Sequence, residues 1–465
     1  MIIRAWHLPG LADEDVTEWD ERVAGDAVLR MPRLTPAQVT GAMQGIRQAR
    51  SRLHARSVDS IIDVIDSVAR RLLDRGDPLR EAAELALPSL TGYSRPMIEH
   101  ILDGMAADWR RPTLERLLEA DLGGADVLDR PVERHGRRLM ATPYPVVLHV
   151  LAGNIPGVGV TSLVRALLVR AGSFGKLAAG EPLLPVLFAR AVAEQDTAIG
   201  DAMAVAYWPG GDIAIEETAF READAIVVYG GARALADVRH RAPPGVPVLD
   251  HGPRLSIGFV AHDALADHGN VAVLAQDIAR AVATFDQQGC VSPHAIYIED
   301  QAGNAGVDAA RFAGLMVGAL GDMEHVLPRG TLSPDEAAAV REARTRAEFG
   351  QYAGGTTELL SAPDAPFSVI LHRDAGFEPS CLQRTIHVHA VRSIDDALAA
   401  LRSHRALLQS AAVAGADDAL LRRIAQSGFT RITSFAQMAW PDPAGPHDGR
   451  GPLTELVRLV SVEIS

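Results

Sequence analysis

Apolar residues in the first third of the chain recur every three or four positions. The segments "SIIDVIDSVARRLL" (residues 60–73) and "RPTLERLLEADLG" (residues 111–123) both have this spacing, which places the apolar side chains on one face of an α-helix. Ser94 is a suitable N-cap for another helix, because it precedes "RPMIEHILDGM" with a proline near the start. We therefore expect a mainly helical N-terminal part over residues 1–130.

From Met140 onward the apolar residues occur in short runs, each followed by a Gly-rich turn and a helical pattern. The run "VVLHVLA" (146–152) is continuous, as is typical of a strand covered on both faces. "AMAVAYWPGGD" (202–212) and "DAIVVYGGA" (224–232) begin two further cycles of the same kind. Repeated strand, turn and helix predict an α/β domain with a doubly wound, Rossmann-like parallel sheet over residues 131–262.

A second α/β part follows the first. After a strand near residue 255, a helical segment leads directly to Cys290, and we place the domain boundary close to Asp263. Further strand-like runs occur at residues 294–300, 367–373 and 384–391. We expect an α/β domain over residues 263–435, and a loop, a short helix and a strand over residues 436–465.

Length and composition agree with this division. A chain of 465 residues suggests two domains, and 48% hydrophobic with 22% charged residues is typical of a globular protein.

The formal charge is −14, from 45 basic and 59 acidic residues, so nucleic acid is not expected as a partner. The N-terminus turns acidic before any signal-like apolar run, and no apolar run is long enough to span a membrane. We expect a cytoplasmic protein.

Cys290 is one of only two cysteines, the other being Cys381. It lies among small residues in "TFDQQGCVSPHAIYIED" (284–300), after a helix and before a strand-like run. Such a position suits a thiolate nucleophile that forms a covalent adduct with its substrate. The competing interpretation is a buried apolar cysteine. A disulfide between the two cysteines is not expected in a reducing compartment.

Three other segments have residues suited to ligand binding at strand ends. Asn154 in "LAGNIPGVG" can donate from its amide to an oxyanion, although it can equally cap the following helix. Lys176 in "GKLAAGEP" can bind phosphate or ribose as a point charge, unless it is simply solvated. The turns "YWPGGD", with Gly210, and "VYGGAR", with Gly230 and Gly231, can bring backbone N–H groups to a pyrophosphate, but neither is a GxGxxG or P-loop sequence.

Several histidines raise the question of a metal site. His387 and His389 alternate with apolar residues in "RTIHVHAV", so both should point to one face of a strand, but no cysteine or carboxylate cluster joins them at ligand spacing. His251, directly after Asp250, and the segment "HDG" (447–449) suit turns and loops. We therefore expect no metal site.

Four segments occur in an order that is more specific than any one of them, and together they resemble a known family. They are "PVVLHVLAGNIPGVGVTSLVRALL", "GKLAAGEPLLPVLFA", "YWPGGD" and "FDQQGCVSPHAIYIE". In this succession they resemble the acyl-CoA reductases of the bacterial luminescence type (LuxC-like), a branch of the aldehyde dehydrogenase superfamily. The likeness runs from about residue 90 to the C-terminus and includes "PHDG" (446–449). It implies a Rossmann-like NAD(P)-binding domain, an α/β catalytic domain and an oligomerisation element, and hence a homo-oligomer.

The resemblance also implies roles for individual residues. Cys290 is similar to the family's nucleophile, and Asn154 to the asparagine that forms an oxyanion hole with the nucleophile's own backbone N–H. Lys176 matches the lysine that contacts the adenosine ribose or its 2′-phosphate. Gly210 and the Gly230-Gly231 turn match the loops around the adenosine and the pyrophosphate.

Two positions depart from the pattern of relatives. Hydrolytic aldehyde dehydrogenases have a glutamate that activates water, whereas this chain has the shorter Asp250 in "DHGPR", which favours exchange with a thiol over hydrolysis. Three residues after the matching lysine, NAD-preferring relatives often have a glutamate that binds the ribose hydroxyls. Ala179 stands there instead and leaves room for a 2′-phosphate. We therefore expect NADPH as the cofactor, with NADH as the alternative.

The predicted function is the NADPH-dependent reduction of an acyl thioester, carried by coenzyme A or by an acyl carrier protein, to the aldehyde through an S-acyl-cysteine. Two alternatives stay open. One is an NAD(P)+-dependent aldehyde dehydrogenase that oxidises an aldehyde to the acid or thioester. The other is a non-catalytic acyl-binding subunit, against which the joint presence of Cys290, Asn154 and Lys176 argues. The sequence does not define the acyl group.

Overall fold

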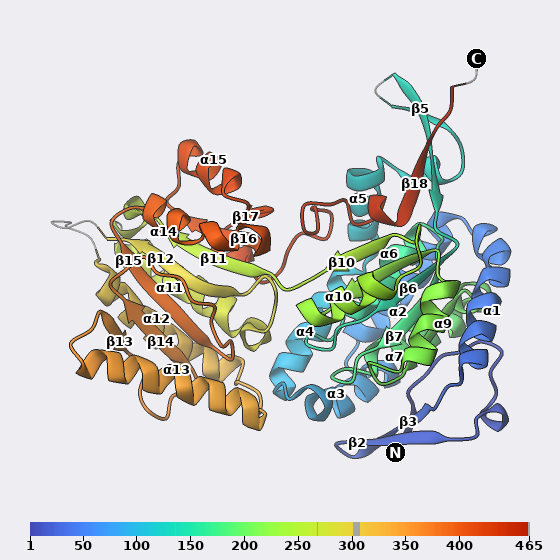
Figure 1. Ribbon diagram of the computed structural model, residues 1–465, viewed down its shortest axis with the longest axis horizontal. Helices are drawn as coiled ribbons and strands as arrows, with labels where there is room; N and C mark the ends of the chain where they lie inside the picture. Colours follow the sequence, from blue (N-terminus) through green and yellow to red (C-terminus); the bar gives the residue numbers. More distant parts are fainter. Residues whose placement is uncertain (135, 267, 301–306, 464–465) are drawn as a thin grey trace. The chain divides into compact units, whose positions relative to one another are not determined.

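The computed structural model of the chain describes residues 1–134, 136–266, 268–300 and 307–463. The chain forms two compact units, each built on its own sheet of mainly parallel strands (Figure 1). Unit 1 combines Met1–Thr91, Ile98–Gly252 and Asp442–Ser465, and unit 2 combines Gly92–Met97 with Pro253–Pro441. The change of unit therefore falls at Gly252, ahead of the boundary expected near Asp263.

The central sheet of unit 1 has five parallel strands in the order β10-β9-β6-β7-β8. β6, the first of these five strands along the chain, lies in the middle of the sheet. β7 and β8 are added on one side and then β9 and β10 on the other, as in the doubly wound Rossmann fold. This arrangement confirms the α/β class and the parallel sheet predicted from the repeated cycles. The strands are β6 (Val146–Val150), β7 (Gly172–Leu177), β8 (Met203–Tyr207), β9 (Ala225–Tyr229) and β10 (Val248–His251).

Helices cover both faces of this sheet. One face packs against α1 (Pro36–His54), α9 (Ile213–Glu222) and α10 (Ala232–Arg241) through a single apolar core. On the other face lie α6 (Val158–Leu168) and α7 (Leu184–Gln195), which in turn contact α2 (Val58–Leu73). Local sequence supports these helices: Thr35 and Gln38 form a reciprocal capping box at the start of α1, and Ser57 caps α2.

Two small sheets complete unit 1. In the first, β3 (Ala27–Pro32) lies between β1 (Ile2–Arg4) and β2 (Trp19–Ala24). It pairs in parallel with β1 and forms an antiparallel hairpin with β2. In the second, the C-terminal strand β18 (Val457–Ser461) pairs with β5 (Arg137–Pro143), which also pairs with β4 (Val132–Arg134). The remaining helices are α3 (Pro78–Thr91), α4 (Arg95–Asp108), α5 (Arg111–Leu122) and α8 (Thr197–Gly200). The N-terminal part thus contains strands as well as helices.

Unit 2 is built on a seven-stranded sheet in the order β13-β14-β15-β12-β11-β16-β17, parallel except for the edge pair β13 and β14. Its strands are β11 (Leu255–Val260), β12 (Pro293–Glu299), β13 (Thr357–Leu359), β14 (Ser368–His372), β15 (Thr385–Val391), β16 (Leu408–Ala414) and β17 (Arg431–Thr433). One face packs on α11 (His268–Ala283) and α12 (Ala309–Val326), and the other on α14 (Ile394–Ala400) and α15 (Asp418–Gln426). Helix α13 (Pro334–Tyr352) lies beside β13.

Among the residues that the structure describes, no helix is long and apolar enough to cross a membrane.

Candidate active site

Cys290 lies in unit 2, in the loop between the short 3-10 helix η4 (Thr284–Gln287) and β12. Its side chain is exposed, so it is not the buried apolar cysteine of the competing interpretation. The Ser256 hydroxyl donates to the Cys290 carbonyl over 2.7 Å and accepts from the Ser410 N–H over 3.2 Å. Strands β11 and β16 therefore fix the backbone that presents the thiol.

The turn before Cys290 has an unusual backbone. Phe285, Asp286 and Gln287 have φ values of 59°, 47° and 65°, in the left-handed region that costs about 1–2 kcal/mol for each residue with a side chain. The Gln287 amide donates to the carbonyls of Pro293 and Thr385 over 2.8 and 2.9 Å. The local sequence does not favour this conformation, so tertiary contacts must hold it.

A second left-handed run supplies part of that support. Leu382, Gln383 and Arg384 have φ values of 66°, 55° and 61°, and the Arg384 guanidinium binds the Asp286 carboxylate over 2.7 Å. The other Asp286 oxygen accepts from the Gly330 N–H over 3.0 Å. Both carboxylate oxygens are thus satisfied, which fixes the turn that leads to Cys290.

Arg431 of β17 is coupled to Cys290 through charge. Burial lowers the pKa of the Arg431 guanidinium, and an anionic Cys290 opposes that fall. The guanidinium is held in place by the carbonyls of Met438 and Gln437, at 2.8 and 2.6 Å. A fixed cation of this kind favours the thiolate form of a cysteine. The sequence prediction missed Arg431, because nothing near it in the chain points to Cys290.

The other predicted residues lie in unit 1, where the structure brings them to one edge of the sheet. Asn154, Gly210 and the Gly230-Gly231 turn follow β6, β8 and β9, while Lys176 and Ala179 lie at and after the end of β7. These four strands are parallel neighbours, so their carboxyl ends meet at the same edge. In open α/β sheets this edge is where ligands bind.

The Asn154 loop is pressed against the loop that follows Lys176. A Cβ on Gly153 would lie 2.7 Å from the Glu181 nitrogen, and one on Gly180 would lie 2.8 Å from the Gly153 oxygen. Glycine is therefore required at both positions. Asn154 is exposed, and the N-cap of α6 is Gly157 rather than Asn154.

Lys176 and the neighbouring turns fit a nucleotide. Burial lowers the pKa of the Lys176 amine, while the Glu216 carboxylate raises it. Gly231 is the N-cap of α10, which has no side-chain cap, and a Cβ built on Gly210 or Gly231 would meet nothing within 4 Å. Open glycine turns with an uncapped helix N-terminus suit a phosphate. These residues would hold the pyrophosphate and ribose of a nicotinamide nucleotide.

Comparison with known proteins identifies the family. The family model described as "Acyl-CoA reductase (LuxC)" matches residues 53–459, which is most of the chain. The chain belongs to the acyl-CoA reductase (LuxC) family. It is therefore an aldehyde-forming oxidoreductase, and the resemblance noted in the sequence is confirmed.

Curated relatives agree with this assignment. The chain is 26% identical to the "Long-chain acyl-protein thioester reductase" of Aliivibrio fischeri, over 88% of this chain and 82% of that protein. It is 25% identical to the protein of the same name from Vibrio harveyi, over 88% of this chain and 84% of that protein.

Solved structures confirm the aldehyde-dehydrogenase-like fold. Aldehyde dehydrogenase 21 of Physcomitrella patens, in complex with succinate, matches with a TM-score of 0.75 and 12% identity over 99% of this chain and 98% of that one. Aldehyde dehydrogenase C of Pseudomonas syringae, in complex with NAD+ and octanal, matches with a TM-score of 0.73 and 15% identity over 99% and 96%.

Asp250, which the sequence offers as a candidate base, is engaged with two arginines. Its carboxylate binds the Arg239 guanidinium over 2.7 Å, and its carbonyl accepts from Arg450 over 2.6 Å. The Arg239 guanidinium therefore competes with a water molecule for the Asp250 carboxylate.

The reductase also has a polar cluster that the sequence did not predict as a unit. His251 of β10 is bound by the carboxylates of Asp448 and Glu455, at 3.0 and 3.3 Å. The centroid of its ring lies 4.6 Å from that of Tyr229 and 4.3 Å from that of His447. Burial lowers the pKa of His251, but the two carboxylates outweigh it and raise the pKa overall.

His251, His447 and Asp448 lie close enough to be considered for a metal ion. The lone pairs of imidazole lie in the ring plane, however, so two stacked rings do not direct them to one ion. The "PHDG" segment and the Asp250-His251 pair were the sequence signals for this cluster, in which the two carboxylates favour the protonated form of His251.

The two histidines predicted on one strand face lie on β15. His387 Nδ1 is 2.9 Å from His372 Nε2, and His389 Nδ1 is 2.9 Å from the Asp374 carbonyl oxygen. Burial lowers the pKa of His387 to about 3 and that of His389 to about 4, so both rings are neutral at pH 7. With Cys381, His372 and His387 border a cavity of about 380 Å³ in unit 2.

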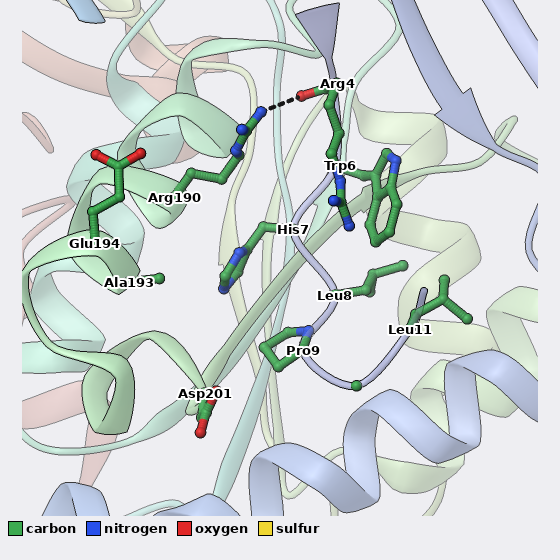
Figure 2. Close-up of a pocket in the computed structure, with 11 residues that line it drawn as sticks. Arg4, Trp6, His7, Leu8, Pro9, Leu11, Arg190, Ala193, Glu194 and Asp201 are labelled. Carbon is green, nitrogen blue, oxygen red and sulfur yellow. Dashed lines mark hydrogen bonds between the residues drawn. The ribbon is translucent and has the colours of Figure 1, made fainter. Parts of the chain in front are cut away.

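A cavity of about 440 Å³ in unit 1 is shown in Figure 2. Arg190 of α7 donates to the Arg4 carbonyl at its wall over 3.2 Å, and His7, Glu194 and Asp201 complete its charged and polar lining (Figure 2). Asp201 precedes β8, so this cavity lies towards the amino end of that strand, whereas Gly210 follows its carboxyl end. No residue predicted for the active site is among those that line it.

Proposed function

We propose that this enzyme reduces an acyl thioester to the aldehyde with NADPH, through a covalent S-acyl intermediate on Cys290. The observation that carries the proposal is the exposed thiol of Cys290 at the end of a backbone turn fixed from several strands, with Arg431 acting on it as a cation. An exposed cysteine with a fixed backbone and a nearby cation suits a nucleophile. The names of the Aliivibrio and Vibrio relatives support a thioester as the substrate.

In the first step the Cys290 thiolate attacks the thioester carbonyl carbon. A carbon–sulfur bond to Cys290 forms, the carbon–sulfur bond to the carrier thiol breaks, and that thiol leaves as a thiolate that takes a proton from solvent. Such a leaving group needs little acid assistance. We propose coenzyme A or an acyl-carrying protein as the donor, and a long-chain acyl group in view of the relatives' names.

In the second step the acyl carbon is reduced. NADPH, when bound, supplies the hydride. We propose that the Asn154 side-chain amide and the Cys290 backbone N–H donate to the oxyanion of the resulting hemithioacetal, which Cys290 carries. Collapse of this oxyanion breaks the bond to sulfur, releases the aldehyde and restores the Cys290 thiolate.

The preference for NADPH rests on the loop after β7. Lys176 is proposed to bind the adenosine ribose or its 2′-phosphate, and Gly210, Gly230 and Gly231 to surround the adenosine and pyrophosphate. Ala179 is exposed and brings no negative charge to that loop. NADH is the alternative hydride donor.

The oxidative alternative needs a base that activates water. Asp250 is the candidate for that base, and the Arg239 guanidinium competes with water for its carboxylate. We therefore favour transfer of the acyl group between thiols over hydrolysis to the acid.

The test is the loss of NADPH absorbance when the purified enzyme is given acyl-CoA thioesters of graded chain length, with Cys290→Ala beside the wild type. We expect NADPH loss and aldehyde formation that require both the thioester and Cys290, while Cys290→Ala still binds NADPH. Because Cys381 is the second cysteine, Cys381→Ala is the matched control and should retain activity. Substantial activity in Cys290→Ala would exclude the covalent mechanism. If free thioesters fail, acyl-carrier-protein thioesters are the next donors to assay.

A further inference from the structure

Arg22 joins the N-terminal hairpin to the loop after β7. It lies on β2, and its guanidinium donates to the Ala179 carbonyl, across a wide separation in sequence. Both residues belong to unit 1. The contact places a cation beside Ala179, the position at which, by the resemblance, NAD-preferring relatives often have a glutamate.

The loop itself offers no carboxylate to a ribose. Its acidic residue is Glu181, which is buried and accepts from the N–H groups of Leu183 and Leu184 over 2.9 and 2.7 Å. Those bonds occupy Glu181 at the start of α7. In doubly wound folds, the region after the second strand distinguishes the two cofactors: an acid there binds the 2′-hydroxyl of NAD, whereas an arginine accommodates the 2′-phosphate of NADP. In unit 1 the second strand is β7.

The charge of Arg22 is not neutralised by the hairpin. Asp20 on the same strand is bound by Arg33 over 2.7 Å, and Glu21 is paired with Arg30 over 4.0 Å. In the part of the chain that the structure places, no ion pair involves Arg22, and it is half-buried rather than fully solvated. A partly desolvated guanidinium with donors to spare suits a phosphate, which it can bind through two parallel hydrogen bonds.

The hairpin holds Arg22 in place. Arg22 is paired in register with Leu29 of β3, which is completely buried. The chain just after β1 also contacts the main sheet, because His7 and Val205 of β8 exchange backbone hydrogen bonds of 2.9 and 2.7 Å. Since the strand is anchored in this way, little ordering of the backbone is required when a phosphate binds.

We propose that Arg22 determines the specificity for NADPH by binding the 2′-phosphate of the adenosine ribose, together with Lys176. This inference rests on the proposed function in one respect, namely that a nicotinamide nucleotide binds at the carboxyl edge of the sheet in unit 1. It adds a residue from outside the Rossmann-like segment, supplied by the first 32 residues of the chain.

The experiment measures dissociation constants for NADPH, NADH, 2′,5′-ADP and 5′-ADP with the full-length wild type and with Arg22→Ala, Arg22→Lys and Arg130→Ala. Arg130 is an exposed arginine paired with Asp126, so its substitution removes the same charge elsewhere on unit 1. For Arg22→Ala we expect the constants for NADPH and 2′,5′-ADP to rise at least about tenfold, as for the loss of a charge-assisted hydrogen bond. The dissociation constants for NADH and 5′-ADP should change less than about twofold.

Arg22→Lys should restore part of the NADPH affinity, and Arg130→Ala should behave like the wild type. A loss in Arg22→Ala that is equal for all four ligands would overturn the inference, because it would show a general effect on the fold. So would NADPH binding that Arg22→Ala leaves unchanged, and in that case the proposed function would stand. A wild type that binds none of the four nucleotides would instead overturn the proposed function together with this inference.

Discussion

Asp286 and Arg384 form a buried ion pair of 2.7 Å, in which the carboxylate side chain is 2% exposed and the guanidinium side chain 1% exposed. Each residue belongs to a run of three left-handed residues, and the first run leads to Cys290. Burial raises the pKa of Asp286, and Arg384 opposes that rise. The pair therefore joins two strained turns that local sequence alone would not stabilise.

Asp286→Asn should destabilise the protein by about 1.5–3 kcal/mol, because it removes the charge-assisted hydrogen bonds from the buried Arg384 guanidinium, which keeps only its ion pair with Glu324. Denaturant unfolding followed by circular dichroism measures this change. The matched control is Asp395→Asn, which breaks the exposed pair between Arg423 and Asp395 and should cost about 0–1 kcal/mol. Similar losses in the two variants would show that the buried pair does not support the turn.

Asn154→Ala should lower kcat by about 100-fold or more while the melting temperature stays unchanged, because one donor to the oxyanion is removed. Steady-state kinetics with the preferred thioester give the rate. Asn270→Ala, which changes an exposed asparagine of α11, is the control and should keep full activity. A twofold effect at Asn154 would place it outside the oxyanion hole.

Ala179→Glu should weaken NADPH binding more than NADH binding, since the new carboxylate would repel a 2′-phosphate and accept from ribose hydroxyls. The dissociation constants of both nucleotides are the measurement. Ala179→Gln has the same size without the charge and separates repulsion from crowding. Equal weakening of both nucleotides by the glutamate would contradict the proposed position of the ribose.

Asp250→Asn should leave thioester reduction within about threefold of the wild type, because Asp250 is engaged by Arg239 and is not needed as a base. The assay is NADPH oxidation, together with a search for carboxylic acid when the aldehyde and NADP+ are supplied. If the wild type forms acid and Asp250→Asn does not, Asp250 is the base of a hydrolytic dehydrogenase.

Glu181 should make stability depend on pH. Burial raises its pKa from 4.5 to about 7, and the amides of Leu183 and Leu184 oppose that rise. Between these two values the folded state holds a proton that the unfolded state has lost, so the contribution of Glu181 to stability falls as the pH rises. Relative to Glu181→Gln, the wild type should lose up to about 3 kcal/mol across this window, at about 1.4 kcal/mol per pH unit. Unfolding of both proteins at several pH values from 4.5 to 8 measures the difference, and a constant difference would contradict the assignment.

Much of the fold could be predicted because periodicity is a local property of the chain. The continuous apolar run at 146–152 became β6, and the two cycles that followed became β8 with α9 and β9 with α10. Strands buried between two layers of helices need apolar side chains on both faces, so their pattern survives in the sequence. The predicted N-cap Ser94 also accepts from the Met97 N–H over 3.3 Å.

The sequence by itself determined the α/β class, the Gly-rich turns after the strands and the segment around Cys290, since each depends on neighbouring residues. Other features were decided by the tertiary structure alone, because they depend on contacts between residues far apart in the chain. The left-handed turn before Cys290 is held by Arg384, His251 is bound by Asp448 and Glu455, and Arg22 reaches Ala179. Periodicity records which side of an element is buried, but not which distant partner covers it, and charged partners of this kind leave no spacing pattern in the chain.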